Sequence, residues 1–184
     1  GAPLVGKESN ETTHLSIVDQ WGNAVAATLT INLTFGSGLV AEGTGIILND
    51  EMDDFVAAPG QPNAFGLVGG EANAIAPGKR PLSSMTPTIV LENGKVRMVT
   101  GAPGGSRIIT TTLQTIVNVV DFRMDALQAV SAPRVHHQWF PPRLYYEAYG
   151  LSPDTAALLA GWGHDLVSRG PMCNAQIIVV DPAT

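Results

Sequence analysis

Hydroxyl side chains at the start of an alternating segment are the first candidates for chemistry in this sequence. Residues 8–34 read ESNETTHLSIVDQWGNAVAATLTINLT, with Thr12 near the head of the alternation and polar residues returning at Thr30 and Asn32. A threonine hydroxyl becomes a nucleophile when a base takes its proton, and a free N-terminal amine can be that base. Thr12 would gain such an amine only if the chain were cut between Glu11 and Thr12. The plainer interpretation is that threonines favour strands.

The alternation around Thr12 also predicts the strands that would position it. Residues 12–18 and 23–33 alternate apolar and polar side chains, and the intervening DQWGN supplies turn residues. An antiparallel hairpin centred on Trp21 would place Thr12 opposite Thr30 at its open end. The apolar residues then share one face of the hairpin, and the polar residues form a single cluster on the other.

Two short motifs further along the chain offer groups that bind anions. Gly104 and Gly105 lie in GAPGGSR, just before a predicted helix, where backbone N–H groups and the helix dipole could hold a developing oxyanion. The alternative is a tight turn without that role. Ser83 and Ser84 in RPLSSM form either a polar ligand clamp or a plain turn in which a serine hydroxyl bonds the backbone.

The acidic cluster and the paired histidines carry weaker signals. Glu51, Asp53 and Asp54 lie on a predicted turn, where acidic residues are usually solvated. His136 and His137 are neighbours, and neighbours in a strand face opposite sides. No spacing of cysteine, histidine and carboxylate residues matches a zinc site, so the sequence favours structural histidines and predicts no metal site.

The composition indicates one globular domain of the α+β class. The chain has 184 residues, 45% of them hydrophobic, and its sixteen acidic against ten basic residues argue against a nucleic-acid surface. No apolar run reaches the length of a membrane span, and a single cysteine, Cys173, excludes an internal disulfide. A second hairpin is expected around Asn93 and Gly94, and a buried strand at 175–180. Helices are expected within 107–122 and at 124–132 and 152–161.

Taken together, these motifs resemble the small, catalytic subunit of γ-glutamyltranspeptidase, a member of the N-terminal-nucleophile hydrolase superfamily. The resemblance runs from Glu8 to Val180 and rests on ETTHLSIVD, TINLTFGSG, LNDEMDDF, PGKRPLSSMTPTIV, TGAPGGSRIITT and PRVHHQW. It implies a four-layer αββα sandwich, of which this chain is the catalytic-subunit part. It also implies a lead segment, residues 1–11, upstream of an autocleavage site, and a catalytic domain, residues 12–184, that stops before the family's closing strand.

The resemblance implies a role for each motif residue. Cleavage between Glu11 and Thr12 would make Thr12 the nucleophile and its freed amine the general base, with Thr30 hydrogen-bonded to that amine or to the Thr12 hydroxyl. The amides of Gly104 and Gly105 would hold the oxyanion. The α-amino end and the α-carboxylate end of a γ-glutamyl group would be held by two sets of residues: Asn32, Glu51 and Asp54 for the first, Ser83 and Ser84 for the second.

A lid over the site is also implied by the resemblance. The segment 58–70, APGQPNAFGLVGG, matches the loop that bacterial members fold over the active site. A tyrosine is common near the tip of that loop, whereas this chain has Phe65. Phe65 can cover the pocket but cannot donate a hydrogen bond to Asn32, so we expect a looser lid.

The implied reaction is a two-step acyl transfer that needs no metal or cofactor. A γ-glutamyl group would pass from glutathione or a related amide to Thr12 as an ester, and then to water, an amino acid or a peptide. The implied partner is a large subunit cut from the same precursor, with no nucleic acid and no membrane contact by this chain. Family members act in the periplasm or outside the cell.

Other functions fit the same motifs. A glutaryl or cephalosporin acylase, or a poly-γ-glutamate transferase, would use the same fold. Asp54 argues against a glutaryl substrate, because that group lacks the ammonium that Asp54 would pair with. A non-catalytic homologue that is never processed would keep the bond between Glu11 and Thr12 intact.

Overall fold

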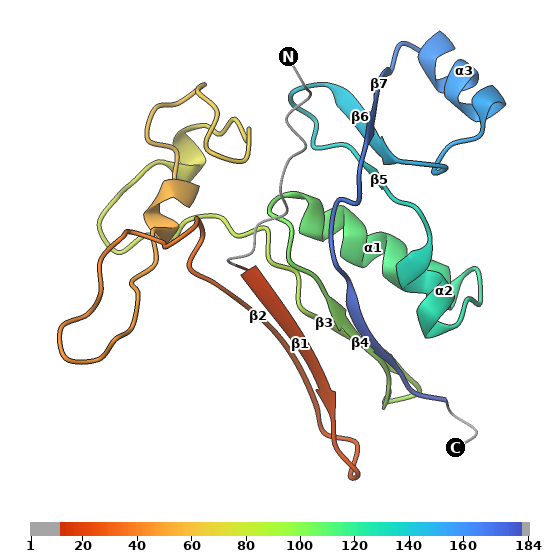
Figure 1. Cartoon of the computed structure of the whole chain (residues 1–184), viewed down its shortest axis with the longest axis horizontal. Helices are drawn as coiled ribbons and strands as arrows, with labels where there is room; N and C mark the ends of the chain where they lie inside the picture. Colours follow the sequence, from red (N-terminus) through yellow and green to blue (C-terminus); the bar gives the residue numbers. More distant parts are fainter. Residues whose placement is uncertain (1–11, 182–184) are drawn as a thin grey trace.

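The computed structural model describes residues 12–181 (Figure 1). The predicted lead segment, including Glu11, and residues 182–184 lie outside the described residues. Eight strands in three small sheets combine with three α-helices and two short 3₁₀ helices in this range, which confirms the α+β class. None of the helices in the described range is both long enough and apolar enough to cross a membrane.

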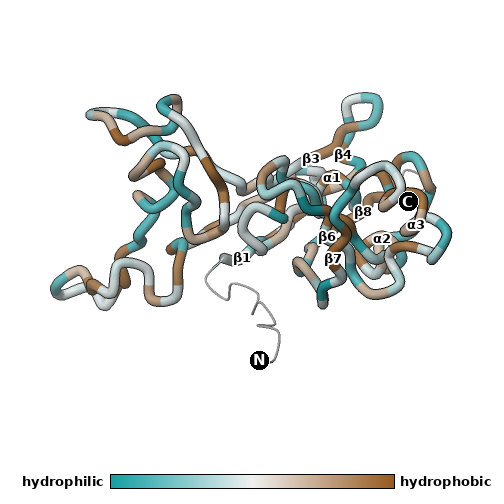
Figure 2. The backbone as a smooth tube through the Cα atoms, turned by 90° about the horizontal axis from the view of Figure 1, so that it is seen from above, coloured by the Kyte–Doolittle hydropathy of each residue, from teal (hydrophilic) through white to brown (hydrophobic). Residues whose placement is uncertain are grey.

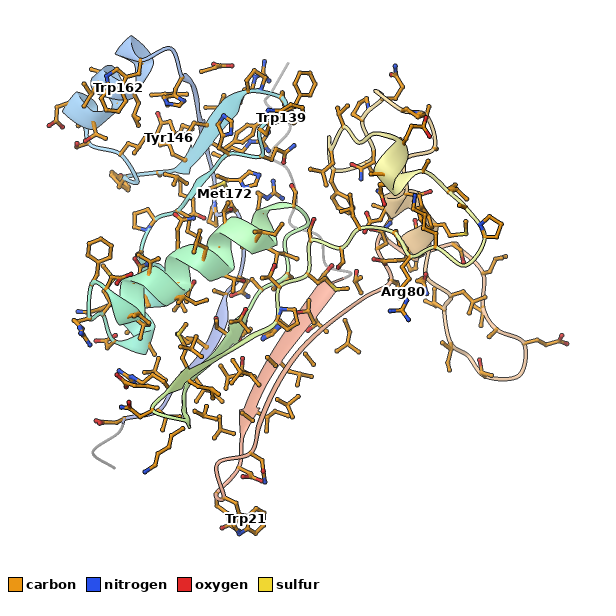
Figure 3. All side chains as sticks on the ribbon, turned by 180° about the vertical axis from the view of Figure 1, so that it is seen from behind. Trp21, Arg80, Trp139, Tyr146, Trp162 and Met172 are labelled. Atoms are coloured by element: carbon orange, nitrogen blue, oxygen red, sulfur yellow. The ribbon has the colours of Figure 1, made fainter. Side chains whose placement is uncertain are left out.

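The first hairpin joins β1 (Thr12–Val18) to β2 (Ala24–Thr30). Its strands are antiparallel with Thr12 opposite Thr30, which confirms the predicted register. The turn is held by Asp19, whose carboxylate accepts the backbone N–H groups of Trp21 and Asn23 at 2.9 Å each. Trp21 projects from the closed end of the hairpin (Figure 3), and Thr12 lies at the opposite, open end.

The second sheet has the order β3-β4-β8 and is antiparallel throughout. Its strands are β3 (Thr88–Glu92), β4 (Lys95–Gly101) and β8 (Gln176–Val179). The predicted hairpin turn is confirmed, since Asn93 and Gly94 both have positive φ, as a two-residue hairpin loop of this type requires. The strand expected at 175–180 is β8, an edge strand that is only partly buried, with Ile177 and Val179 packed against the hydrophobic cluster.

Two helices pack against this sheet. They are α1 (Arg107–Val120) and α2 (Ala126–Ser131), close to the predicted positions. Met98 of β4, Val119 of α1 and Ala129 of α2 form the centre of a hydrophobic cluster. Helix α2 begins with a capping box, in which Asp125 and Gln128 each bond the other's backbone N–H. The helices therefore form one outer layer over the sheet, as the sandwich prediction requires.

A third sheet, not among the predicted elements, lies beyond the N-terminal half of α1. Its strands are β5 (Val135–His136), β6 (Arg143–Glu147) and β7 (Asp165–Arg169), in that order. The expected helix at 152–161 is present as α3 (Pro153–Gly161) and connects β6 to its parallel neighbour β7. The Ser152 hydroxyl accepts the backbone N–H of Thr155 and caps this helix, with proline at its first position.

Residues 31–87 leave the open end of the first hairpin and form a separate lobe, coloured orange to yellow-green in Figure 1. Figure 2 shows this lobe standing beside the sheets and helices. It contains the 3₁₀ helices η1 (Glu51–Asp54) and η2 (Glu71–Asn73) and is otherwise built from turns and isolated bridges. The predicted acidic turn is thus a single helical turn, which fixes the directions of its carboxylates.

The first hairpin packs against the second sheet with its polar face. The His14 ring lies directly over Gly101 of β4, where any Cβ would collide with it. The opposite face is apolar and exposed, by 51% at Ile17 and 55% at Leu29. The predicted division into a polar and an apolar face is correct, but the described part of the chain leaves the apolar face uncovered.

Candidate active site

The nucleophile candidate lies at the open end of the first hairpin. The hydroxyl oxygens of Thr12 and Thr30 are 2.9 Å apart, within hydrogen-bonding distance. The Thr30 oxygen also accepts the backbone N–H of Asn32 at 2.9 Å, which leaves its own proton available for Thr12. Asn32 is buried and has a φ of 73°, so the chain turns sharply here.

A small cleft brings the two threonines together with residues that are distant in sequence. The predicted site residues that line it are Thr12, Thr30, Asn32, Glu51, Asp54, Phe65, Ser83, Ser84 and Gly105. Three further lining residues were not predicted, namely Met85, Ser106 and Ile108. Each of the three is a sequence neighbour of a predicted residue or motif, and that proximity was the available signal. Gly104 is not among the residues that line the cleft.

The acidic side of the cleft is set by η1. Burial raises the pKa of Glu51 to about 7, and the nearby charges of Asp54 and Asp50 add to this effect. Burial also raises the pKa of Asp54, although its hydrogen bond with Glu51 acts in the opposite direction. Two carboxyl groups with raised pKa values are hard to ionise at the same time, and a cation bound between them would stabilise their charged forms. The arrangement therefore suits an ammonium group.

The serine pair occupies another part of the same cleft. The Ser83 hydroxyl accepts the backbone N–H of Met85 at 3.2 Å, and the Ser84 carbonyl accepts the hydroxyl of Thr86 at 2.9 Å. The turn that the sequence suggested is therefore present. It does not replace the ligand-clamp interpretation, because Ser83 and Ser84 both line the cleft.

The glycine turn before α1 requires both of its glycines. Gly104 has a φ of 141° and Gly105 a φ of 61°, values that residues with a Cβ rarely adopt. A Cβ on Gly105 would lie 2.8 Å from Cδ1 of Phe65, and one on Gly104 would collide with Sγ of Cys173. The turn is thus packed between the ring of Phe65 on one side and Cys173 on the other, with Ser106 leading into the helix.

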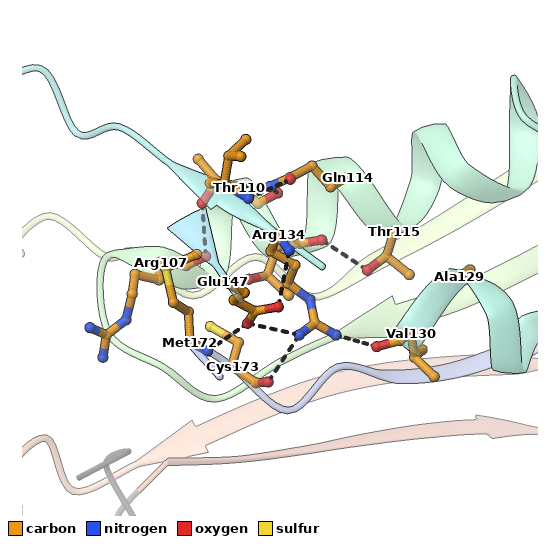
Figure 4. Close-up of polar contacts among 12 residues, drawn as sticks. Arg107, Thr110, Gln114, Thr115, Ala129, Val130, Arg134, Glu147, Met172 and Cys173 are labelled. Atoms are coloured by element: carbon orange, nitrogen blue, oxygen red, sulfur yellow. Dashed lines mark hydrogen bonds and ion pairs between the residues drawn. The ribbon is translucent and has the colours of Figure 1, made fainter. Parts of the chain in front are cut away.

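A buried ion pair supports the far side of this turn (Figure 4). The Glu147 carboxylate accepts the backbone N–H groups of Arg134 and Met172, at 3.0 and 2.6 Å, and the Arg134 guanidinium at 3.3 Å. The guanidinium also donates to the carbonyl of Cys173 at 3.4 Å and to that of Val130. The pair therefore fixes the 172–173 backbone against which Gly104 packs. Neither charged residue was predicted, since nothing local marks their pairing.

The lid candidate is a compact hairpin loop. The Asn63 side-chain oxygen accepts the backbone N–H groups of Phe65 and Leu67 at 3.0 and 2.9 Å. An isolated bridge between Pro62 and Val68 closes the loop behind this turn. Phe65 is therefore held on a well-defined tip, with its ring against Gly105. The expectation of a looser lid stays a prediction.

The buried histidines are tied to neighbouring hydroxyl groups. Nδ1 of His14 lies 2.7 Å from the Thr28 hydroxyl, and Nδ1 of His136 lies 2.8 Å from the Thr110 hydroxyl. Burial lowers the pKa of both rings, which favours their neutral forms. Among residues 12–181 no three histidine, cysteine or acidic side chains are grouped so that they could hold a metal ion.

Comparisons with known proteins agree with the site described above. A family model described as gamma-glutamyltranspeptidase matches residues 3–184. The chain is 57% identical over 179 residues to the glutathione hydrolase proenzyme of Escherichia coli (strain K12), covering 97% of this chain and 31% of that protein. It is 53% identical over 179 residues to the glutathione hydrolase proenzyme of Pseudomonas aeruginosa, covering 96% and 32%. The chain thus spans about a third of the length of these relatives.

Solved structures give the same relationship. A mutant gamma-glutamyltranspeptidase of Helicobacter pylori superposes with a TM-score of 0.88 at 54% identity, covering 92% of this chain and 91% of that one. The enzyme of Pseudomonas nitroreducens complexed with L-DON gives 0.84 at 51% identity, covering 94% and 91%. The predicted fold class, the catalytic-subunit part of an N-terminal-nucleophile hydrolase, is confirmed by these superpositions. The chain belongs to the gamma-glutamyltranspeptidase family.

Proposed function

We propose that this chain is the catalytic part of a γ-glutamyl transferase and glutathione hydrolase with Thr12 as its nucleophile. The observation that carries the proposal is the cleft that joins the threonine pair, the acidic pair and the serine pair beneath one glycine turn. A nucleophile, a cation site and hydroxyl donors are the groups that a γ-glutamyl amide would require. The names of the relatives, which are glutathione hydrolase proenzymes, support the same substrate class.

Maturation is the first step of the proposed mechanism. The Thr12 hydroxyl attacks the carbonyl carbon of Glu11, and the peptide bond is replaced by an ester as the Thr12 nitrogen leaves with a proton. Water then hydrolyses this ester, which restores the hydroxyl and leaves Thr12 with a free α-amine. Thr30 can donate its hydroxyl proton to the Thr12 oxygen, because its own oxygen is fixed by the N–H of Asn32.

Catalysis would then use the freed amine as the base. The amine takes the Thr12 hydroxyl proton while the oxygen attacks the γ-carbonyl of the donor, and the N–H groups of Gly104 and Gly105 stabilise the oxyanion. Collapse releases the donor's amine, which takes up the proton, and leaves a γ-glutamyl ester on Thr12. Water or an amine acceptor attacks the ester and frees the enzyme.

The proposed specificity follows from the two ends of the γ-glutamyl group. Glu51 and Asp54 would bind its α-ammonium, assisted by Asn32, and Ser83 and Ser84 would donate hydrogen bonds to its α-carboxylate. An ammonium between the two carboxyl groups would allow both to ionise. This pairing is the reason to prefer a γ-glutamyl over a glutaryl substrate.

A large subunit from the same precursor is the proposed partner. The exposed apolar face of the first hairpin, including Leu15, Ile17, Val25 and Leu29, is suited to contact with another layer of the fold. The proenzyme names of the relatives, and the third of their length that this chain spans, fit a longer precursor. A periplasmic or extracellular location is part of the proposal and rests on the family resemblance alone.

Intact mass of the full-length precursor over time tests the central claim, beside a Thr12→Ala variant. The expected result is that wild type splits between Glu11 and Thr12 while the variant stays whole. If wild type also stays whole, Thr12 never acquires its amine and the proposed mechanism fails. That outcome would favour a non-catalytic homologue, a class that exists among the relatives as the putative inactive glutathione hydrolase 4 of Arabidopsis thaliana.

An acylase is the second candidate, because the cephalosporin acylase of Bacillus halodurans superposes with a TM-score of 0.76 at 28% identity, covering 93% of this chain and 30% of that one. Parallel assays with γ-glutamyl and glutaryl anilides separate the two functions. Preference for the γ-glutamyl anilide is expected, because only this donor carries an ammonium for Glu51 and Asp54. Faster cleavage of the glutaryl anilide would overturn the substrate assignment.

A further inference from the structure

The lid tip is held to the glycine turn by more than the ring of Phe65. Gln138 follows β5, and its side-chain Nε2 donates to the carbonyl of Gly66 at 3.4 Å, next to Phe65 in the lid. Its Oε1 accepts the hydroxyl of Ser106 at 2.8 Å, next to Gly105 in the glycine turn. One side chain therefore bridges the two residues that flank the contact between Phe65 and Gly105.

The orientation of the Gln138 amide is fixed by its surroundings. Its oxygen lies between the Ser106 hydroxyl and Nε2 of His136, at 2.8 and 3.1 Å. The carbonyls of Gly66 and Phe140 can only accept hydrogen bonds, so the group that faces them cannot be this oxygen. The amide nitrogen must then face the opposite way, where the carbonyls of Gly66 and Phe140 accept its two hydrogens.

Gln138 is also attached to a rigid part of the fold. The Gln114 side chain of α1 accepts the backbone N–H of Val135 at 2.9 Å and donates to its carbonyl at 2.8 Å. Strand β5 is thus bound to α1, the helix that begins just after the glycine turn. A shift of the lid relative to this turn would have to break the contacts of Gln138, because Gln138 is attached to β5 and β5 is bound to α1.

Opening the lid would change what reaches Thr12. A cavity of about 680 Å³ lies against the lid, lined by Asn63, Leu67 and Gln138, and shares Ser106 and Asp54 with the cleft. The cavity is large enough to hold many water molecules. Asn63, Leu67 and Gln138 line this cavity, while Phe65 at the lid tip lines the cleft that contains Thr12, so the lid contacts both volumes.

We infer that Gln138 is a positioning residue that holds the lid tip closed over the oxyanion turn and so protects the γ-glutamyl ester from water. This inference rests on the proposed function for its effect on catalysis. The lid contact itself can be measured without turnover. Where a tyrosine at the lid tip could bond Asn32, Phe65 cannot, and Gln138 supplies a polar attachment from the other side of the tip.

The test is Gln138→Glu in the mature full-length enzyme, followed by hydrogen–deuterium exchange and product analysis. Glutamate keeps both acceptor positions toward Ser106 and His136 but has no N–H for the carbonyl of Gly66. Gln128→Glu is the matched control, because it makes the same change in the capping box of α2, where the side chain only needs to accept.

Exchange at residues 60–69 should rise about two- to tenfold in Gln138→Glu and stay unchanged in the control, as expected for one lost hydrogen bond. The ratio of hydrolysis to transfer with a γ-glutamyl donor should rise by a similar factor. Unchanged lid exchange overturns the inference, and so does faster exchange with an unchanged product ratio.

Gln138→Ala provides a second measurement if Gln138→Glu lowers the melting temperature, since it also lacks the donor but adds no charge. It should show the same increase in lid exchange, and normal lid exchange in this variant would count against the inference. Failure of the proposed function is recognised separately, because wild type would then release no γ-glutamyl product while its lid exchange remained measurable.

Discussion

Replacing Glu147 by alanine tests how the buried ion pair supports the glycine turn. Arg134 and Glu147 are each about 8% exposed, so their charges are largely removed from water. Loss of Glu147 leaves the guanidinium buried without its counter-charge and leaves the backbone N–H of Met172 without its acceptor. Breaking such a pair on one side costs about 3–5 kcal/mol. We expect a loss of unfolding free energy of that size.

A double-mutant cycle separates charge pairing from simple loss of packing. Arg134→Met should also cost about 3–5 kcal/mol, because it leaves the Glu147 carboxylate unpaired. The double variant Arg134→Met/Glu147→Leu leaves no unpaired charge. Its loss of unfolding free energy should therefore be smaller, by at least about 2 kcal/mol, than the summed losses of the single variants Arg134→Met and Glu147→Leu. Urea unfolding of the full-length precursor in a Thr12→Ala background measures these values on a chain that stays whole.

The Glu147→Ala variant also tests whether the buried ion pair affects catalysis. With Thr12 intact, Glu147→Ala should lower kcat more than it raises KM, because Gly104 packs on Cys173 in the segment that Glu147 holds. Costs that add within about 0.5 kcal/mol would refute the coupled pair. An unchanged kcat in a destabilised variant would refute its connection to the oxyanion turn.

Two further predictions concern the cleft. Thr30→Val removes the hydroxyl that lies 2.9 Å from Thr12 and should lower kcat/KM about 5- to 150-fold, whereas Thr30→Ser keeps the hydroxyl and should lose less; equal losses would refute the role of the hydroxyl. Because the pKa of Glu51 is raised to about 7, this carboxyl group gains a proton as the pH falls through 7 and attracts an ammonium less. The value of kcat/KM for a γ-glutamyl donor should therefore fall as the pH is lowered through 7. A glutaryl donor or the Glu51→Gln variant should lack this step in the pH profile. A step that persists in Glu51→Gln must come from another group.

The first hairpin was predictable because its information is local. Alternation fixes which residues share a face, and the DQWGN turn fixes the register, so the pairing of Thr12 with Thr30 follows from a short stretch of sequence. The residues brought to the cleft from the lobe, such as Glu51 and Ser83, were identified by resemblance. Their approach to Thr12 depends on a long irregular segment that carries no periodic signal.

The contacts behind the site could not be predicted for a similar reason. Arg134 and Glu147 are 13 residues apart. Arg134 directly precedes β5 and Glu147 ends β6, and these short strands alternate too briefly to be recognised. Their partner Met172 comes from yet another segment. A buried ion pair of this kind follows from three-dimensional packing, and the sequence alone presents its members as ordinary charged residues.

The orientation of the first hairpin connects catalysis to assembly. A nucleophile needs neighbours that can hold and move a proton, and β1 presents these on the same face as Thr12, against β4 of the second sheet. Because side chains alternate along a strand, this arrangement forces Ile17 and Leu29 onto the opposite face, where no residue within 12–181 buries them. The same alternation that builds the polar site therefore creates the apolar surface that the proposed large subunit would cover.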